Sequence, residues 1–323
     1  MIDVNQERLM FRVLDMYYNE QLSQEIIAKK FHISRSTISR IITKAKKDGY
    51  ITIHINYPMN GSIDLEKEFE KRFKLEEAVI AEVDNPTILN NIVPATAAEY
   101  LLRIISDNQK IAMSWGTTLR RTVDYMSVFI SSVKVIPKNV SIIPLLGSPK
   151  MGLDYSDQLN YSNVLAKKLG SILRTTSYSL SSPMIVENKT IKGVLESEKQ
   201  IGDIIEMGKA ADIAIVGIGS VDEESSPLFS GLITSDEQKE LVRKGIAGEI
   251  AARYYNSSGE IVKTKLDDRL IGVKASEILA IPLRVGIAYG HKKVKAIRAA
   301  LEGNLINTII TDSITAEEIL KEG

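Results

Sequence analysis

A hydroxyl-rich turn in the first half of the chain has the residue types of an anion-binding site. The mostly apolar run KIAM (110–113) is followed by Ser-Trp-Gly-Thr-Thr and then by a helical pattern. Glycine lets the backbone approach a ligand closely, and the N–H groups and hydroxyls at a helix start attract negative charge. We therefore predict that Gly116, Thr117 and Thr118 hold a phosphate or another small anion.

Three other apolar runs end in similar residues. SIIPLL, ADIAIV and RVGIAY are followed by GS, GIGS and GHKK, respectively. In an open α/β sheet, ligands bind beyond the carboxyl ends of the strands. These ends therefore predict one shared pocket, to which Gly147, Ser148 and Lys293 contribute.

The individual strand ends differ in how strongly they indicate a ligand. A cation in the first turn of a helix interacts unfavourably with the helix dipole. The presence of Lys293 there is therefore better explained by a negatively charged ligand than by helix stability. A solvated lysine is the alternative. The GIGS segment favours an ordinary turn, because glycine after a strand is common turn chemistry. It also lacks the third glycine of a dinucleotide-binding loop.

The region 23–47 has the pattern of two capped helices joined by a short turn. Ser23 is the predicted N-cap of the first helix, in which Ile26 and Ile27 are expected to face inward. Ser34 is the predicted N-cap of the second helix. The buried face of that second helix is predicted from i, i+3, i+4, i+7 spacing to consist of Ile38, Ile41, Ile42 and Ala45.

This second helix is the predicted recognition helix of a helix-turn-helix. Seven Lys or Arg residues and no Asp or Glu lie between residues 29 and 47, although the formal net charge of the chain is zero. A solvated face on a plain helical hairpin is the alternative, but an acid-free face of donors favours contact with DNA phosphates and base edges. The predicted DNA-binding residues are Ser34, Arg35, Ser36, Thr37, Arg40 and Lys44.

A domain boundary is predicted at the turn residues 58–61. Before it, Gly49 ends the recognition helix and the alternating segment YITIHINY resembles a half-buried strand. Residues 1–58 are thus expected to form a winged helix-turn-helix domain. Residues 59–323 are expected to form a second domain for effector binding and oligomerisation.

The second domain begins with a predicted helix capped by Ser62. Leu65, Phe69 and Phe73 fall on one face of that helix. This face is expected either to pack on its own domain or to serve as a linker or dimer helix, and the spacing does not decide between the two. Beyond it, short β-rich runs alternate with helical stretches, which predicts a doubly wound α/β domain with a mostly parallel sheet.

The composition excludes several classes of protein. The chain has no cysteine, so disulfides, thiol nucleophiles and cysteine zinc sites are ruled out. Its apolar runs are too short to span a bilayer, and the N-terminal residues lack a signal-peptide pattern. We expect a cytoplasmic protein with no membrane partner.

No catalytic or metal-binding set is evident in the sequence. His32 and His54 fall in the predicted DNA-binding segment, and His291 stands alone. Carboxylates such as Glu249 and those at 267–268 are not paired by their spacing. We therefore predict no catalytic residues, no metal and no cofactor.

Longer motifs extend these patterns. The N-terminal region contains YYNEQLSQEIIAKKFHISRSTISRIITKAKKDGYITI, and the second domain contains SWGTTL, IIPLLGS, ADIAIVGIG, GEIAARYYNSSGEIV, RLIGV and GHKKVKAIRAALEGNLINTIITDSITAEEIL. With these motifs the chain resembles, over nearly its full length, the SorC/DeoR-type bacterial transcriptional regulators of sugar catabolism. The resemblance implies a second domain similar to the ribose-5-phosphate isomerase and glucosamine-6-phosphate deaminase fold. It also implies homodimers or homotetramers on operator DNA, with a sugar or sugar phosphate as effector.

The resemblance also implies roles for single residues. Gly116, Thr117 and Thr118 match the loop that holds the effector phosphate in the family. Lys293 matches a lysine that faces the same ligand, and Glu249 matches an acidic position that meets sugar hydroxyls.

Some positions depart from the family pattern. Leu146 stands where the deoxyribose-phosphate sensor has a lysine that bonds covalently to its effector, so we expect reversible binding here. Ser148 replaces a glycine of the same motif, and Asn256 replaces a common aspartate. Tyr289 stands where relatives often have glycine, which would reshape the pocket.

Two functions are consistent with these patterns. The first is a DNA-binding regulator, such as a repressor, of a carbohydrate-catabolism operon that responds to a sugar or sugar phosphate. The alternative is a sugar-phosphate isomerase or deaminase-like enzyme with an appended DNA-binding domain. The enzyme would need an acid–base pair converging on the pocket, and the sequence shows no such pair.

Overall fold

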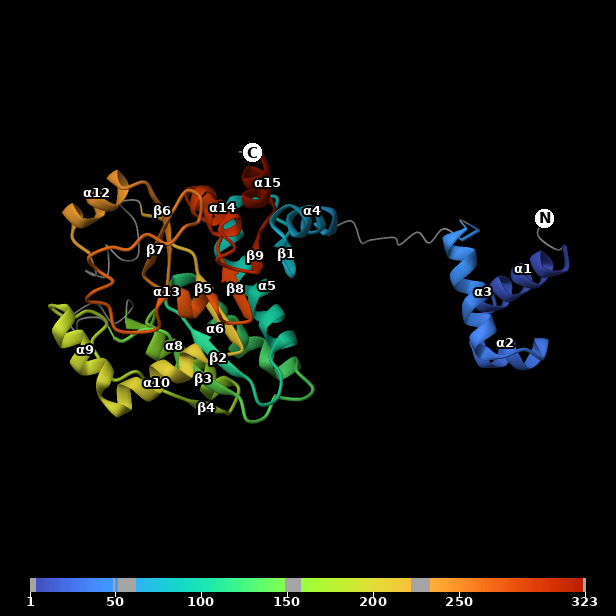
Figure 1. Cartoon of the computed structure of the whole chain (residues 1–323), viewed down its shortest axis with the longest axis horizontal. Coiled ribbons are helices and arrows are strands. Elements are labelled where there is room, and N and C mark those ends of the chain that lie inside the picture. Colours follow the sequence, from blue (N-terminus) through green and yellow to red (C-terminus); the bar gives the residue numbers. More distant parts are fainter. Residues whose placement is uncertain (1–3, 49, 52–61, 149–157, 222–232, 322–323) are drawn as a thin grey trace. The chain divides into compact units, whose positions relative to one another are not determined.

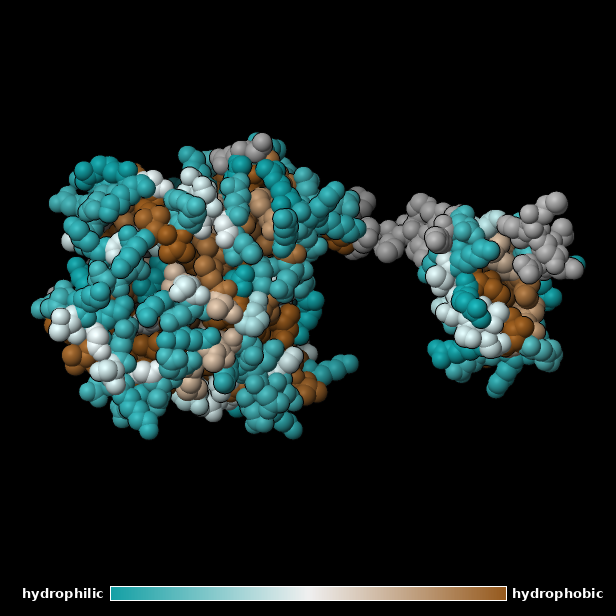
Figure 2. All heavy atoms as spheres, viewed as in Figure 1, coloured by the Kyte–Doolittle hydropathy of each residue, from teal (hydrophilic) through white to brown (hydrophobic). Residues whose placement is uncertain are grey.

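A computed structural model describes residues 4–48, 50–51, 62–148, 158–221 and 233–321. The chain forms two units, Met1–Met59 and Asn60–Gly323. Figure 1 shows the helices and strands of each unit, and each unit has hydrophobic core residues of its own. Hydrophilic residues cover much of the visible face of both units in Figure 2.

The described residues of the N-terminal unit form the helices α1 (Val4–Tyr18), α2 (Gln24–Phe31) and α3 (Arg35–Lys47). They pack around a small core in which Val13, Ile27 and Ile38 are fully buried. Within α3 the buried residues Ile38, Ile42 and Ala45 recur at helical spacing, so this helix turns an apolar face to the centre.

The turn between α2 and α3 is tight because His32 adopts the left-handed conformation, with φ 54°. The predicted caps Ser23 and Ser34 both accept a hydrogen bond from the first turn of their helices, as expected. The prediction for Ile26 is wrong: its side chain is 52% exposed, whereas Ile27 is buried. Only one of two successive helical residues can face a core this small.

The predicted wing falls mostly outside the described part of the chain. Gly49 and most of the expected strand YITIHINY lie outside the described residues. The helix α3 ends at Lys47, with Asp48 as its C-cap.

The second unit is built on a seven-stranded sheet in the order β1-β9-β8-β5-β2-β3-β4, and every described strand pair in it is parallel. The predicted parallel α/β sheet is thereby confirmed. Its strands are β1 (Glu77–Ala81), β2 (Lys110–Met113), β3 (Ser141–Pro144), β4 (Thr176–Ser177), β5 (Ile213–Gly217), β8 (Leu283–Ile287) and β9 (Thr308–Asp312).

Helices cover both faces of this sheet (Figure 1). One face packs against α5 (Leu89–Ile104), α6 (Thr117–Phe129) and α8 (Ser162–Ile172). The other face packs against α4 (Ile63–Phe73), α10 (Lys199–Lys209), α13 (Ala275–Leu279), α14 (Val294–Glu302) and α15 (Ser313–Lys321). Because both faces are covered, the central strand β5 (IAIVG) is a continuous apolar run rather than an alternating one.

The predicted first helix of this unit is α4. Phe69 and Phe73 are buried in the core of the sheet unit, so this face packs on its own domain. The prediction that Ser62 caps the helix is wrong. Ser62 occupies the N-cap position, but its hydroxyl donates to Glu82 instead.

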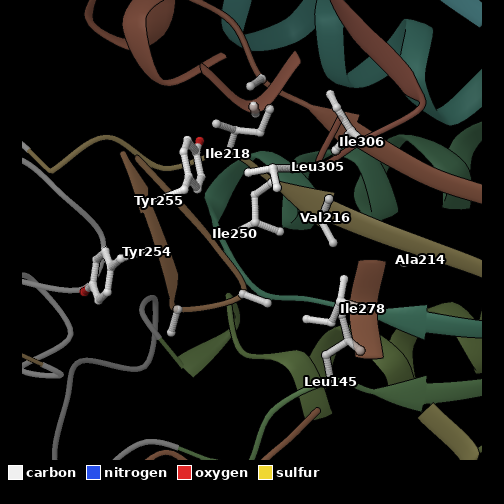
Figure 3. Close-up of a cluster of buried hydrophobic side chains, with 14 of the residues drawn as sticks. Leu145, Ala214, Val216, Ile218, Ile250, Tyr254, Tyr255, Ile278, Leu305 and Ile306 are labelled. Atoms are coloured by element: carbon white, nitrogen blue, oxygen red, sulfur yellow. The ribbon is translucent and has the colours of Figure 1, made fainter. Parts of the chain in front are cut away.

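A two-stranded hairpin, β6 (Ile246–Ile250) and β7 (Arg253–Asn256), lies beside the sheet, between α12 (Ser235–Arg243) and α14 in the chain. Figure 3 shows Tyr255 of β7 pointing toward Ile218, with Tyr254 on the other side of the hairpin. The Tyr255 hydroxyl donates to the Ala296 carbonyl at 3.0 Å, which ties the hairpin to α14. The other helical segments in the described residues are α9 (Lys189–Ser197) and the 3-10 turns η1 (Pro86–Ile88), η2 (Ile130–Ser132) and η3 (His291–Lys293).

Candidate effector site and DNA-binding surface

The Gly-Thr-Thr turn forms the N-terminus of α6. Gly116 has a φ of +126°, which glycine adopts far more readily than other residues, and α6 starts at the next residue. No side chain caps this helix end, so the first-turn N–H groups can receive an anion. Thr118 is buried and Thr117 is exposed, whereas the Gly116 N–H already donates to the Asn160 carbonyl at 2.9 Å.

The four predicted strand ends meet at one edge of the sheet. The strands β8, β5, β2 and β3 are parallel neighbours, so their carboxyl ends lie side by side. Gly116, Gly147, Gly219 and Lys293 each follow one of these strands. The strand order therefore gathers residues that are far apart in the sequence.

Glu249 lies directly against the β5 end. Its backbone pairs with Gly219 through two hydrogen bonds of 2.9 and 3.0 Å, and a Cβ on Gly219 would lie 2.3 Å from the Glu249 Oε1 atom. Gly219 is thus needed for the close approach of a carboxylate. The sequence predicted only an ordinary turn there, because the partner strand is thirty residues further on.

Burial controls the charge of Glu249. Burial raises the pKa of this carboxyl to about 7, and the Ala252 N–H bond and the positive charge of Lys293 offset part of the shift. The Ala252 N–H donates to Glu249 Oε2 at 2.7 Å. A carboxyl group that exchanges its proton near neutral pH thus faces a lysine at this edge of the sheet.

The hairpin that carries Glu249 has a strained turn. Ala251 and Ala252 both have positive φ, at 51° and 56°. Such conformations cost roughly 1–3 kcal/mol each and cluster at functional sites. Both alanines are buried, so surrounding packing holds the turn in place.

Gly147 and Ser148 have structural partners within the protein. A Cβ on Gly147 would lie 2.7 Å from the Ser182 and Pro183 carbonyls, so the glycine permits close backbone packing. The Ser148 hydroxyl accepts a hydrogen bond from Asn163 at 2.8 Å. Their predicted contact with an effector stays a prediction, since residues 149–157 lie outside the described chain. Leu146 is fully buried in the core.

The loop after β8 is tied to two other elements. The Tyr289 hydroxyl donates to Asn90 at 3.0 Å, and Arg121 of α6 donates to the same Asn90 oxygen. No sequence pattern identified Asn90 or Arg121, because each lies on a helix whose spacing shows only a core face. Lys293 ends the 3-10 turn η3 and immediately precedes α14, so the prediction that it lies in the first turn of its helix is corrected by one position.

The predicted recognition helix presents the predicted donors on its outer side. Ser34, Arg35, Ser36, Arg40 and Lys44 are exposed and Thr37 is half-buried, while Ile38, Ile42 and Ala45 are buried and Ile41 is partly buried. The Ser34 hydroxyl lies 2.8 Å from those of Ser36 and Thr37. Arg35 lies 3.9 Å from Glu25 in an exposed ion pair, which leaves its guanidinium accessible to another anion.

The described part of the chain contains neither a metal-binding cluster nor a membrane-spanning helix. Within residues 4–48, 50–51, 62–148, 158–221 and 233–321, no group of three or more His, Cys, Asp or Glu side chains is arranged to hold a metal ion. Nor does any helix in those ranges have the length and apolar character needed to cross a membrane. The exposed His291 pairs with Glu318 at 2.7 Å.

Family models match both units. A model described as "Putative sugar-binding domain" matches residues 57–321, and one described as "Sigma-70, region 4" matches residues 11–47. The second range contains α2 and α3, the predicted helix-turn-helix. The first contains every candidate effector residue.

Whole-chain relatives carry both parts. The transcriptional regulator LsrR of Enterobacter sp. (strain 638) is 31% identical, over 98% of this chain and 94% of its own length. The sorbitol operon regulator of Klebsiella pneumoniae is 28% identical, over 97% and 98%.

Solved structures of transcriptional regulators are also similar to this chain. Full-length SorC from Klebsiella pneumoniae has a TM-score of 0.73 at 27% identity and covers 97% of this chain and 98% of its own. A DeoR family transcriptional regulator from Listeria monocytogenes has a TM-score of 0.71 at 31% identity, with 80% and 99% covered. The chain therefore belongs to the SorC/DeoR-type family of transcriptional regulators.

Proposed function

We propose that this protein binds operator DNA through α3 and changes that binding when a sugar or sugar phosphate occupies the carboxyl edge of its sheet. The observation that carries the proposal is the uncapped N-terminus of α6 at the same sheet edge as Glu249 and Lys293. An anion-binding helix start beside a carboxyl and a cation suits a polyol with a phosphate. The names of relatives, a sorbitol operon regulator and a deoxyribonucleoside regulator, support a sugar-related effector.

The effector residues divide by chemistry. Thr117, Thr118 and the first N–H groups of α6 bind the phosphate, and Lys293 neutralises its charge. Glu249 accepts hydrogen bonds from sugar hydroxyls. The predicted contributors from the β3 end are Gly147 and Ser148.

The DNA-binding residues also divide by role. Arg35, Ser36, Thr37 and Arg40, near the start of α3, contact base edges or phosphates. Lys44, further along the helix, contacts phosphate. Ser34 holds the helix start in place.

Regulation follows from coupling between the two units. We propose a homodimer or homotetramer that acts in the cytoplasm as a repressor, in which effector binding moves the recognition helices relative to their half-sites. The effector binds reversibly, because Leu146 offers no amine for a covalent bond.

One experiment tests the effector half of this proposal. Trp115 is the only tryptophan, is buried, and precedes Gly116 directly. Its fluorescence is expected to change in a saturable way with one member of a panel of free and phosphorylated sugars. The same compound should change the affinity for DNA from the protein's own promoter. If no sugar or sugar phosphate alters either signal, the proposal fails.

A second candidate function rests on Glu249. A carboxyl with a pKa of about 7 beside a lysine has the properties of a general acid or base for a sugar-phosphate isomerase or deaminase. Such an enzyme needs a second proton-transfer group at the bound sugar, and His291 is engaged with Glu318. We therefore favour a regulator without catalysis. Turnover of any pentose or hexose phosphate by the purified protein would reverse that choice.

A further inference from the structure

A cavity lies on the α9 side of the hairpin, apart from the candidate effector residues. Its volume is about 540 Å³, a size that suits a small metabolite. Its walls come from α9, from the loop 261–268, from α13 and from β7, and none of the predicted effector residues lines it.

The floor of this cavity holds two buried cations. Lys192 and Arg253 are only 8% and 3% exposed. Lys192 donates to the Asp267 carbonyl at 2.8 Å and lies 3.7 Å from the Glu196 carboxylate. Within the described residues, the buried Nε of Arg253 has no hydrogen-bond partner.

The acidic group on the floor is already saturated. Asp267 accepts from Arg253 with one oxygen, at 3.0 Å, and from the N–H and hydroxyl of Thr264 with the other. The negative charge of Asp267 is therefore balanced by Arg253. The positive charge of Lys192 is compensated only by the more distant carboxylate of Glu196. Burial accordingly lowers the pKa of Lys192, since the charged form is incompletely compensated.

Cations also outnumber acids around the whole cavity. Its lining contains five Lys or Arg side chains and three Asp or Glu side chains, within a protein of zero net charge. Lys263 and Lys274 are exposed at the rim, where they lie 3.7 Å from Asp268 and 3.9 Å from Glu277 in loose, exposed ion pairs that leave both ammonium groups accessible to another anion. Ile261 and Leu279 add apolar surface that would contact a carbon skeleton.

We propose that this cavity is a second ligand site, which binds a small polyanionic metabolite bearing phosphate or carboxylate groups. Lys192 and Arg253 hold the anion from below and Lys189, Lys263 and Lys274 from the rim. The site is also coupled to the candidate effector site, because Arg253 directly follows the strained turn at Ala251 and Ala252, and its strand partner Ile250 is the neighbour of Glu249. An anion on Arg253 therefore acts on the strand segment that positions Glu249.

The absence of cysteine from the chain makes a local test possible. The variant Ser276→Cys places one thiol on an exposed residue of the cavity lining, and Ser171→Cys places one on an exposed residue of α8 as a matched control. The rate of modification by a neutral maleimide is measured with pyrophosphate, with citrate, and with sodium chloride at equal ionic strength.

The expected result is saturable protection of the S276C thiol by pyrophosphate or citrate, with none at S171C. Protection by only one of the two identifies the anion class. In the S276C background, Lys192→Met should weaken this protection about tenfold, as expected for loss of a charged hydrogen-bond donor. Lys263→Glu, on an exposed side chain that does not threaten folding, should weaken it about fivefold.

The opposite result is equally clear. No protection by either anion, equal protection of both thiols, or protection unchanged by Lys263→Glu would overturn the second site. Adding Thr118→Val should leave the protection unaltered. The outcome is thus independent of whether the effector site is correctly placed.

Discussion

The recognition helix and the carboxyl edge of the sheet place their candidate residues in opposite ways. The DNA-binding candidates come from one short stretch, 34–44, and most are exposed. The effector candidates come from three strand ends and a hairpin, and Thr118 and Glu249 are buried. The first surface is built by local helical periodicity and the second by tertiary packing.

This difference has energetic consequences. Exposed side chains on α3 can be replaced with little effect on folding, since surface substitutions usually change stability by within about 0.5 kcal/mol. A buried residue such as Glu249 affects folding and binding together. Substitutions on α3 should therefore change affinity for DNA with little change in stability. Substitutions of buried residues at the sheet edge should change both stability and affinity for the effector.

The largest expected effect is on DNA binding. The double variant Arg35→Ala, Arg40→Ala should lose roughly 2–6 kcal/mol of operator affinity, because each arginine contact is worth about 1–3 kcal/mol. Its melting temperature and its Trp115 response to effector should match the wild type. Fluorescence anisotropy with labelled promoter DNA measures the loss, and Arg8→Ala on the exposed part of α1 is the control. A comparable loss of effector binding would contradict two separable regions.

The second prediction concerns the pH dependence of folding at the sheet edge. The pKa of Glu249 is raised from 4.5 to about 7, so the folded protein holds this proton more tightly than the unfolded chain. The free energy of unfolding should therefore fall by about 3 kcal/mol, through this group, as the pH rises from about 4.5 to about 7. Glu249→Gln should lack that fall.

Urea denaturation at pH 4.5, 6 and 8 measures the effect as the difference between wild type and Glu249→Gln. That difference should grow with pH in favour of the variant. Glu260→Gln, on an exposed turn of the same region, should show no such trend. A constant difference between Glu249→Gln and wild type would mean that Glu249 is not a buried titrating group.

How far the sequence predicts the structure also differs between the two regions. On α3, spacing alone located the buried Ile38 and Ala45 and the cap Ser34. On α2 the spacing failed at Ile26, because two successive helical residues point in different directions and this small core covers only Ile27. Local patterns contain no information on how much partner surface a helix has.

At the sheet edge the sequence predicted the strand ends but not their partners. The close approach of Gly219 to Glu249, and the Asn90–Arg121–Tyr289 contacts, depend on elements that are far apart in the chain. Only a resemblance to a known family indicated Glu249. Burial, which determines its pKa, follows from the packing of the hairpin and cannot be read from spacing.

A smaller effect is expected at the α6 N-terminus. Thr118→Val keeps the shape of the side chain but removes one hydroxyl donor. The affinity for a phosphorylated effector should therefore fall by about 1.5–3 kcal/mol, or roughly tenfold to a hundredfold. Operator binding without effector should be unchanged. The Trp115 titration measures the loss, and Thr122→Val, one turn further along α6, is the matched control. Equal weakening by both variants would indicate a packing defect rather than a lost ligand contact.

The smallest expected effect separates two serines that have the same position on their helices. Ser34 accepts the Thr37 N–H at 3.1 Å, whereas the Ser62 hydroxyl caps nothing and bonds to Glu82. Ser34→Ala should therefore destabilise the N-terminal unit by about 1 kcal/mol, and Ser62→Ala should change stability by less than about 0.5 kcal/mol. Thermal unfolding followed by circular dichroism measures both, and Ser34→Asn, which restores a cap, should recover most of the loss. The helix α3 owes part of its stability to this cap, whereas α4 is held by Phe69 and Phe73 in the core. If Ser34→Ala and Ser62→Ala lowered stability equally, local capping would not distinguish α3 from α4.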